Sequence, residues 1–218
     1  MIPVFFILAI LLVLWIRYEK NKSDRAISQA TEAFWEKESR ANLTRKQDIS
    51  GLSYLTVPLA CLPLHEITDT ETAELENKLR DLAAKKIVNF TGITNTELKL
   101  MYGAPNITLL MEFDQNYLEL VRTLNRYGKL LYDHGERDAA KTVLEYGIEI
   151  GTDISANYTL LAEIYKEENN LSGIDSVIAR AGTGNSLTKT SLLARLAQLK
   201  AEATGTDPGE STPGTSDS

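Results

Sequence analysis

Residues 120–181 read LVRTLNRYGKLLYDHGERDAAKTVLEYGIEIGTDISANYTLLAEIYKEENNLSGIDSVIARA, and this stretch decides the fold. It contains two copies of one helix–turn–helix unit, and Tyr127-Gly128 in the first copy stands 34 residues before Leu161-Ala162 in the second. The same offset aligns Leu131 with Tyr165, Gly135 with Asn169, Ala140 with Ile174, Leu144 with Ile178 and Gly147 with Ala181. A period of this length is typical of stacked helical hairpins and predicts an all-α fold.

The pattern resembles the tetratricopeptide repeat, in which a small residue lies where the two helices of a unit cross. Gly128, Ala162 and Ala140 stand at such positions. Gly135 matches the turn glycine of the family, and Asn169 can also adopt a left-handed conformation. The second unit departs from the family at Ile174, where a small residue is usual. The resemblance covers residues 120–181 and implies two hairpin units within a helical domain of residues 68–203.

Other helices are expected on both sides of the two units. Residues 71–89 have leucines at helical spacing behind the capping residues Thr68 or Asp69, and residues 95–102 follow the capping residues Thr94 or Asn95. Residues 186–203 carry Leu196 where a third unit would need a small residue, so they predict a cap helix instead. The tail, residues 204–218, has no large apolar residue and is predicted to be disordered.

The N-terminal run MIPVFFILAILLVLWI, residues 1–16, contains no charged side chain. As a helix it would be about 24 Å long, whereas the hydrocarbon core of a bilayer is about 30 Å thick. Trp15 and Tyr18 in the headgroup layer and the long side chains of Arg17 and Lys20 would offset part of that difference. We therefore expect a single transmembrane anchor over residues 1–18. A cleaved signal peptide is disfavoured because no basic residue precedes the run and no small-residue cleavage site follows it. A buried core helix is the remaining alternative.

Basic residues after the run predict the orientation of the anchor. By the positive-inside rule, they place the C-terminal domain of a single-pass protein in the cytoplasm. These residues are Arg17, Lys20, Lys22 and Arg25.

Residues 19–48 are predicted to form a juxtamembrane helix. Two interpretations stay open: a solvated helix that continues the anchor, or a helix whose Phe34 and Trp35 dock on the helical domain or on a partner. Residues 49–67 contain Pro58 and Pro63, which exclude a long helix interior. We expect an extended apolar segment with a packed Cys61, which lies along the helical domain and buries Leu55, Val57, Leu59 and Leu62.

Composition excludes several classes of function. The net charge of −7 and the pI of about 5.0 argue against nucleic acid as a partner, because phosphate binding needs a basic face. Cys61, His65 and His134 are too few and too widely spaced for a metal site. The chain has no phosphate-binding loop and no nucleophile-elbow pattern. We expect no catalytic, cofactor-binding or metal-binding residue, and His134 is expected to cap a helix end.

Binding is the activity that the resemblance implies. In the resembling family, the first helix of each unit lines a groove that holds an extended peptide or a helix. Arg122 and Lys129 lie two turns apart on one face and could meet an acidic segment. The alternative is an ordinary solvated surface. Carried over by position, the partner-binding residues are Arg122, Asn125, Lys129 and Tyr132 from the first unit, and Thr159, Glu163 and Lys166 from the second.

The leading hypothesis is therefore a membrane-tethered adaptor or scaffold whose cytoplasmic helical domain binds a protein. The alternative is a structural subunit of a membrane complex, assembled through the anchor and the helix that carries Phe34 and Trp35. A hydrolase or transferase with an unrecognised site is a third hypothesis. The oligomeric state stays open.

Overall fold

The structure is a computed structural model that describes residues 4–65, 69–183 and 188–205. Regular secondary structure in these residues is helical, which confirms the predicted all-α fold. The β pairing in these residues is one isolated antiparallel bridge between Leu55 and Ile87. The chain divides into two compact units, the first made of residues 1–50 and 93–108 and the second of residues 51–92 and 109–218.

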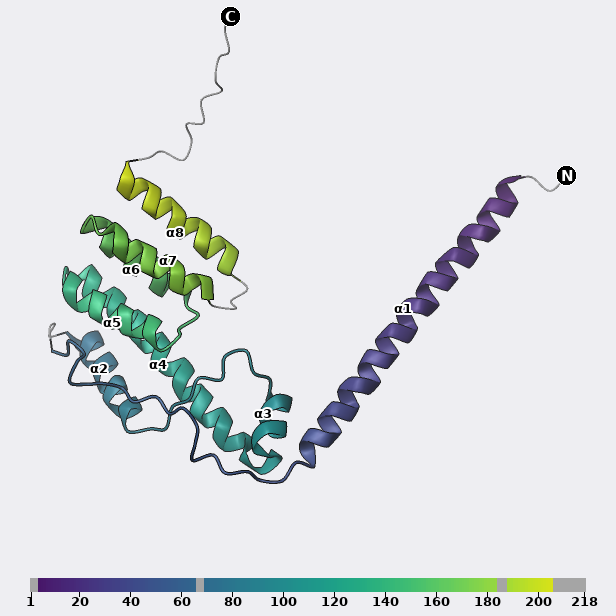
Figure 1. Ribbon diagram of the computed structural model, residues 1–218, viewed down its shortest axis with the longest axis horizontal. Helices are drawn as coiled ribbons and strands as arrows, with labels where there is room; N and C mark the ends of the chain where they lie inside the picture. Colours follow the sequence, from purple (N-terminus) through teal and green to yellow (C-terminus); the bar gives the residue numbers. More distant parts are fainter. Residues whose placement is uncertain (1–3, 66–68, 184–187, 206–218) are drawn as a thin grey trace, which may run out of the picture. The chain divides into compact units, whose positions relative to one another are not determined.

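The first unit contains α1 (Val4–Asn42), a helix of 39 residues without glycine or proline (Figure 1). It joins the predicted anchor and the predicted juxtamembrane helix without a break. It ends at Asn42, whereas the prediction continued the juxtamembrane helix to residue 48. Beyond Asn42 the backbone bonds elsewhere: Thr44 O accepts from Ala104 N at 3.1 Å, and Gln47 N donates to Tyr102 O at 3.0 Å. These partners from residues 93–108 replace the bonds that a longer helix would make.

The apolar part of α1 that the structure describes, residues 4–16, would be about 20 Å long. None of the helices in the described residues combines the length and the apolar character needed to cross a membrane. The predicted transmembrane span is therefore not supported by the structure. Residues 1–3 of that span lie outside the described residues. Several side chains of this part and just after it are more than half exposed: Leu8, Leu11, Leu12, Val13, Leu14, Trp15, Ile16 and Tyr18.

A second helix of the first unit, α3 (Asn95–Tyr102), is held against the C-terminal end of α1 (Figure 1). Thr94 and Glu97 form a capping box at its start, so Thr94 is the one of the two predicted capping residues, Thr94 or Asn95, that caps the helix. Gly103 ends it with a φ of 90° and is followed by the 3-10 helix η1 (Ala104–Asn106). Glu38 of α1 pairs with Lys99 and accepts a hydrogen bond from Thr96 at 2.6 Å. This polar contact fixes α3 on α1.

The second unit contains six helices in the described residues. They are α2 (Thr70–Ala83), α4 (Ile107–Asp133, whose first two residues belong to the first unit), α5 (Arg137–Glu149), α6 (Ser155–Glu167), α7 (Leu171–Thr183) and α8 (Lys189–Thr204). From α5 onward the helices form a layered array, because α5 packs on α6, α6 on α7, and α8 on both α6 and α7 (Figure 1). The core between these helices includes the fully buried Tyr127, Leu131, Leu144 and Leu196.

The residues that define the two predicted hairpin units lie in helices or in the turns between them. Gly128 and Ala162 are buried, and Gly128 lies against Leu144 of α5. Gly135 has a φ of 89° and Asn169 a φ of 55°, so both turns use the left-handed conformation. Ile174, which replaces the usual small residue, is fully buried in α7.

The extended segment runs along the helical domain between residues 51 and 65. Val57 and Leu62 are buried, and Leu55 and Leu59 pack against the same core while half-buried. Cys61 is exposed, so its predicted packing is wrong. The reason is a tight turn in which Pro58 O accepts from the backbone N–H groups of both Cys61 and Leu62, so that Leu62 is the residue that is buried.

Some predicted features fall outside the described residues. These are residues 66 and 67 of the extended segment, residues 186 and 187 of the cap helix, and residues 206–218 of the tail. Thr204 and Gly205 are described: α8 ends at Thr204, and Gly205 closes it with a φ of 67°.

Candidate interaction surface

The predicted partner-binding residues lie in two stripes on the helices of the second unit. Arg122, Asn125, Lys129 and Tyr132 follow one face of α4, and Thr159, Glu163 and Lys166 follow one face of α6. Arg122 and Lys129 are exposed and the other five are half-buried, so all seven reach the surface. We call the surface made by these two stripes, together with the stripe on α8 formed by Arg195, Gln198 and Glu202, the inner face.

The stripe on α8 was missed by the sequence analysis. Lys166 Nζ lies 2.8 Å from Glu202 Oε2, and Arg195 of α8 lies 3.4 Å from Glu163. Gln198 also donates to Glu202, at 2.9 Å. The hydrogen bond from Lys166 lowers the pKa of Glu202. The spacing of residues 195, 198 and 202 on one helix face was the available signal, but only the fold shows that this face meets α6.

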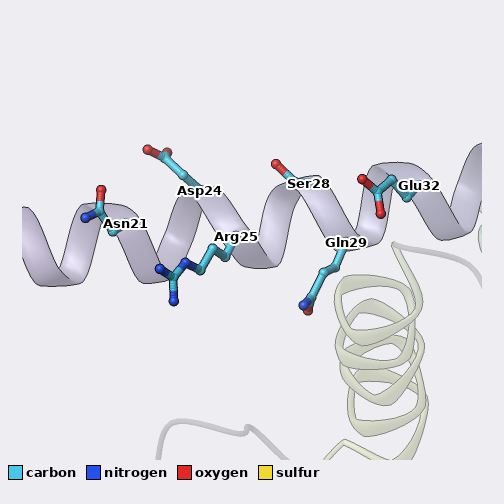
Figure 2. A pocket seen from close by; sticks show the side chains of 6 residues that line it. All are labelled: Asn21, Asp24, Arg25, Ser28, Gln29 and Glu32. Carbon is cyan, nitrogen blue, oxygen red and sulfur yellow. The ribbon is translucent and has the colours of Figure 1, made fainter.

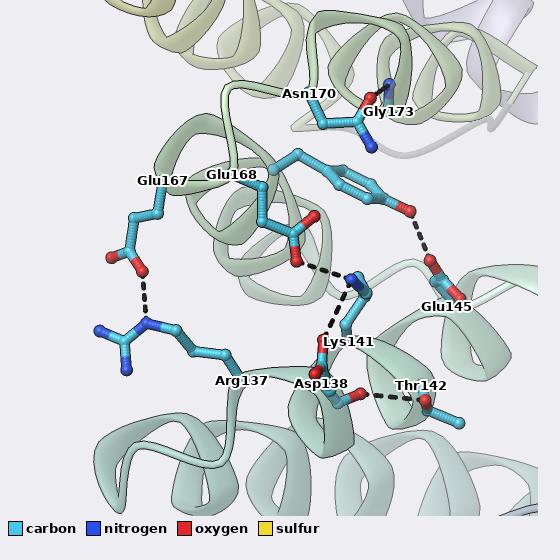
Figure 3. Close-up of polar contacts among 10 residues, drawn as sticks. Arg137, Asp138, Lys141, Thr142, Glu145, Glu167, Glu168, Asn170 and Gly173 are labelled. Carbon is cyan, nitrogen blue, oxygen red and sulfur yellow. Dashed lines mark hydrogen bonds and ion pairs between the residues drawn. The ribbon is translucent and has the colours of Figure 1, made fainter.

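Tyr132 is tied to α6 by a shared carboxylate. Its hydroxyl donates to Glu167 at 2.6 Å, and Arg137 binds the other oxygen of Glu167 at 2.6 Å (Figure 3 shows the Arg137–Glu167 pair). The guanidinium of Arg137 also lies over the Tyr132 ring, 5.1 Å from its centre. The hydrogen bond from Tyr132 has the largest effect in lowering the pKa of Glu167, and the bond from Arg137 lowers it further. The same hydrogen bond to Glu167 raises the pKa of Tyr132.

The two basic residues expected to meet an acidic segment differ in their surroundings. Lys129 pairs with Asp133 one turn later on the same helix, at 2.8 Å. Arg122 makes no ion pair with any residue that the structure describes. Thr159 donates to the carbonyl of Ser155 at 3.1 Å within its own helix. Most charged groups of the inner face are thus already paired within the chain.

A second set of polar contacts ties α5 to the end of α6. Lys141 bonds to Glu168 at 2.6 Å and to Asp138 at 3.3 Å (Figure 3). The bond to Glu168 raises the pKa of Lys141. Glu145, further along α5, accepts a hydrogen bond from the Tyr165 hydroxyl.

A hollow of about 220 Å³ opens between α5, α6 and α7. Carboxylates from α5 and a guanidinium from α7 stand around an apolar floor, a combination that the sequence analysis did not identify. The lining residues are Glu145, Ile148, Glu149, Leu161, Tyr165, Ser176, Val177 and Arg180. They come from three helices and are separated by up to 35 positions in the sequence. No local sequence pattern therefore predicts that they line one hollow.

A different hollow lies on α1 alone. Figure 2 shows its lining side chains arranged along that single helix. A space that one helix borders by itself is the gap between exposed side chains, and it has no convergent set of groups. Its lining residues are Asn21, Asp24, Arg25, Ser28, Gln29 and Glu32.

The two histidines lie in polar surroundings. His134 Nε2 lies 3.9 Å from Asp69, the N-cap residue of α2. His65 lies beside the buried carboxylate of Glu76, with Nδ1 3.3 Å from Glu76 Oε2. Within the part of the chain that the structure describes, no three histidine, cysteine or acidic side chains come together as a metal site would require.

No protein-family model, no characterised protein and no solved structure matches this chain.

Proposed function

We propose that this protein is a membrane-tethered interaction module, an adaptor or scaffold whose helical domain binds a protein partner. The observation that carries the tether is the run from Leu11 to Ile16 in α1, where six consecutive side chains are each more than half exposed. Consecutive side chains point in all directions around a helix, so a groove on one side cannot cover them. A helix that is apolar all round suits a lipid environment.

The residues at the end of the run and directly after it support insertion, and the basic residues that follow it favour a helical domain in the cytoplasm. Trp15 and Tyr18 stand at the polar end of the run, where aromatic rings favour the headgroup layer. Arg17 and Lys20 can extend their long side chains toward the same layer. The proposed anchor is residues 1–18, in a single-pass arrangement.

Extraction of membranes with alkaline carbonate tests the tether. We expect the full chain to stay in the membrane pellet and Leu12→Glu/Leu14→Glu to be released, because two carboxylates in the hydrocarbon are costly. Ser28→Glu/Gln29→Glu adds the same charge to α1 beyond the apolar run and should stay in the pellet. Recovery of the unmodified chain in the soluble fraction would contradict the tether.

The proposed binding surface is the inner face of the helical array. In an array of helical hairpins, successive units place corresponding side chains on one extended surface, and such surfaces hold peptides and helices. Ion pairs hold the stripes on α6 and α8 together, and Tyr132 of the α4 stripe donates to Glu167 at the end of α6. A protein segment, either extended or helical, is the proposed ligand.

Crosslinking from membranes, with a photoreactive residue at Asn125, tests this surface. We expect Arg122→Glu/Lys129→Glu to lose a specific crosslinked protein. The matched control is Lys85→Glu/Lys189→Glu, which makes the same charge change outside the three stripes. An identical set of crosslinked proteins from all three chains would exclude the inner face as the binding surface.

The second candidate function is a structural subunit of a membrane complex. It is favoured by Phe34 and Trp35, which are 53% and 61% exposed on α1 and make an edge-to-face contact with each other at 5.4 Å. Exposed aromatic pairs are common anchors in protein interfaces. In this case Phe34→Ala/Trp35→Ala would disrupt assembly and Arg122→Glu/Lys129→Glu would not.

A further inference from the structure

We infer that the hollow between α5, α6 and α7 is a docking pocket for a single basic side chain, arginine in preference to lysine, of a protein partner. The inference rests on the proposed function in one respect, since it requires that the helical domain binds a protein. It adds a contact outside the inner face. At about 220 Å³ the hollow is smaller than the roughly 300–1,000 Å³ of pockets for small-molecule ligands. A side chain anchored in a larger partner suits this volume.

The floor of the hollow suits the hydrocarbon part of a long basic side chain. Ile148, Leu161 and Val177 line it from three different helices, and each is less than a tenth exposed. The methylene groups of arginine or lysine can cover apolar surface while the charged end reaches the rim. A short acidic or amide side chain would leave this floor uncovered.

The rim contributed by α5 suits the positive charge. Glu145 and Glu149 stand one turn apart and are both exposed. The hydroxyl of Tyr165 donates to Glu145, and burial raises the pKa of Tyr165, so this hydroxyl keeps its proton and holds the carboxylate in place. Glu149 makes no hydrogen bond or ion pair with the residues that the structure describes. Both of its oxygens are therefore open to a guanidinium, which can bind them in parallel.

The Tyr165 ring is held by its contact with α7. A Cβ atom at Gly173 would lie 2.6 Å from Cδ1 of the ring, so the absence of a side chain at Gly173 lets the ring lie directly against the helix backbone. A ring fixed in this way can pair with a guanidinium through its π face. Arginine benefits from both the ring and the carboxylate, which is the reason to prefer it to lysine.

Arg180 restricts which residues can flank the docked arginine in the partner. It lines the hollow from α7 and forms no ion pair with any described residue. Its charge disfavours a second positive charge close to the first. The two carboxylates and one guanidinium around the hollow leave one negative charge to compensate, so the preferred partner segment carries one arginine with neutral or acidic neighbours.

Methyl NMR of the full chain in detergent micelles, titrated with N-acetyl-arginine amide, tests the pocket. We expect the methyl signals of Ile148, Leu161 and Val177 to shift and to saturate. Glu149→Gln should weaken this binding about five-fold, as loss of one charged partner does. The matched control, Glu74→Gln, changes an exposed carboxylate on α2 and should leave the binding unchanged. The uncharged analogue N-acetyl-citrulline amide should not shift these signals.

Three results would overturn the inference: no shift at these methyl groups, equal shifts with the citrulline analogue, or the same weakening in Glu149→Gln and Glu74→Gln. The methyl spectra of the unliganded variants show whether each variant is folded. If the pocket does not bind arginine but the inner-face variant still loses its crosslinked protein, the inference alone fails. If arginine binds and the inner-face variant loses nothing, the proposed binding surface alone fails.

Discussion

Replacement of Gly128 by alanine tests how closely α4 and α5 approach each other. A Cβ atom at this position would lie 2.8 Å from Cδ2 and 2.9 Å from Cγ of Leu144. Leu144 is fully buried, so its side chain cannot move into solvent to make room. The substitution therefore forces either an unfavourable rotamer of Leu144 or a shift of one helix.

Two opposing effects determine how much Gly128→Ala changes the free energy of unfolding. Alanine in place of glycine inside a helix stabilises by about 1 kcal/mol. Overpacking of a core contact costs about 1–3 kcal/mol, so we expect Gly128→Ala to lower the free energy of unfolding by about 1 kcal/mol. At Gly182 in α7, a Cβ atom would have no heavy atom within 4 Å, and only the propensity effect acts there. Gly182→Ala should therefore be neutral or stabilising, whereas Gly128→Ala should be destabilising.

Urea unfolding, followed by the far-ultraviolet circular dichroism signal of the helices, measures both variants with the full chain in detergent micelles. A double-mutant cycle with Leu144→Ala identifies the contact. Leu144→Ala alone should cost about 2–5 kcal/mol because it leaves a cavity, and part of that cost should disappear when Gly128→Ala fills the space. A Gly128→Ala variant at least as stable as Gly182→Ala, or strict additivity in the cycle, would refute the close approach at Gly128.

Three further predictions concern stability and use the same unfolding assay. Glu76 is buried and accepts from the Tyr127 hydroxyl at 3.1 Å, so Glu76→Ala should cost about 2–4 kcal/mol; a loss below about 1 kcal/mol would contradict this. Gly135→Ala should cost about 1 kcal/mol because of its φ of 89°, and an unchanged midpoint would count against it. The hydrogen bond from Tyr132 lowers the folded-state pKa of Glu167. The wild-type chain should therefore have a larger free energy of unfolding than Glu167→Gln at pH values above the unfolded-state pKa near 4.5, and this difference should vanish as pH falls through the folded-state pKa. A difference that stays constant from about pH 7 to about pH 3 would argue against that assignment.

Features that depend on neighbouring residues could be predicted from the sequence. The helix start at Thr94 follows from a capping residue three positions before Glu97. The left-handed turns at Gly135 and Asn169 follow from residue types that tolerate this backbone. The small residue at Gly128 predicted a helix contact because a close approach needs little side-chain volume.

Features that depend on distant partners could not be predicted in this way. The apolar spacing continues to Ile87, yet α2 ends at Ala83 because Ile87 pairs with Leu55 of the extended segment. The third stripe of the inner face exists because α8 packs on α6, and nothing near Arg195 in the sequence indicates Glu163 as its partner. The hollow is a space left between three helices, and periodicity describes one helix at a time.

The pairing of charges on the inner face limits what that face can contribute to affinity. A partner carboxylate that approaches Lys166 has to replace Glu202, which already lies 2.8 Å away at a partly exposed site. Such a pair contributes about 0–1 kcal/mol, and exchange of one pair for another leaves little net gain. The inner face is therefore suited to selecting and orienting a partner by its charge pattern. Affinity has to come from groups that are unpaired and from apolar surface that becomes buried. The hollow provides both, in Glu149 and in the floor formed by Ile148, Leu161 and Val177.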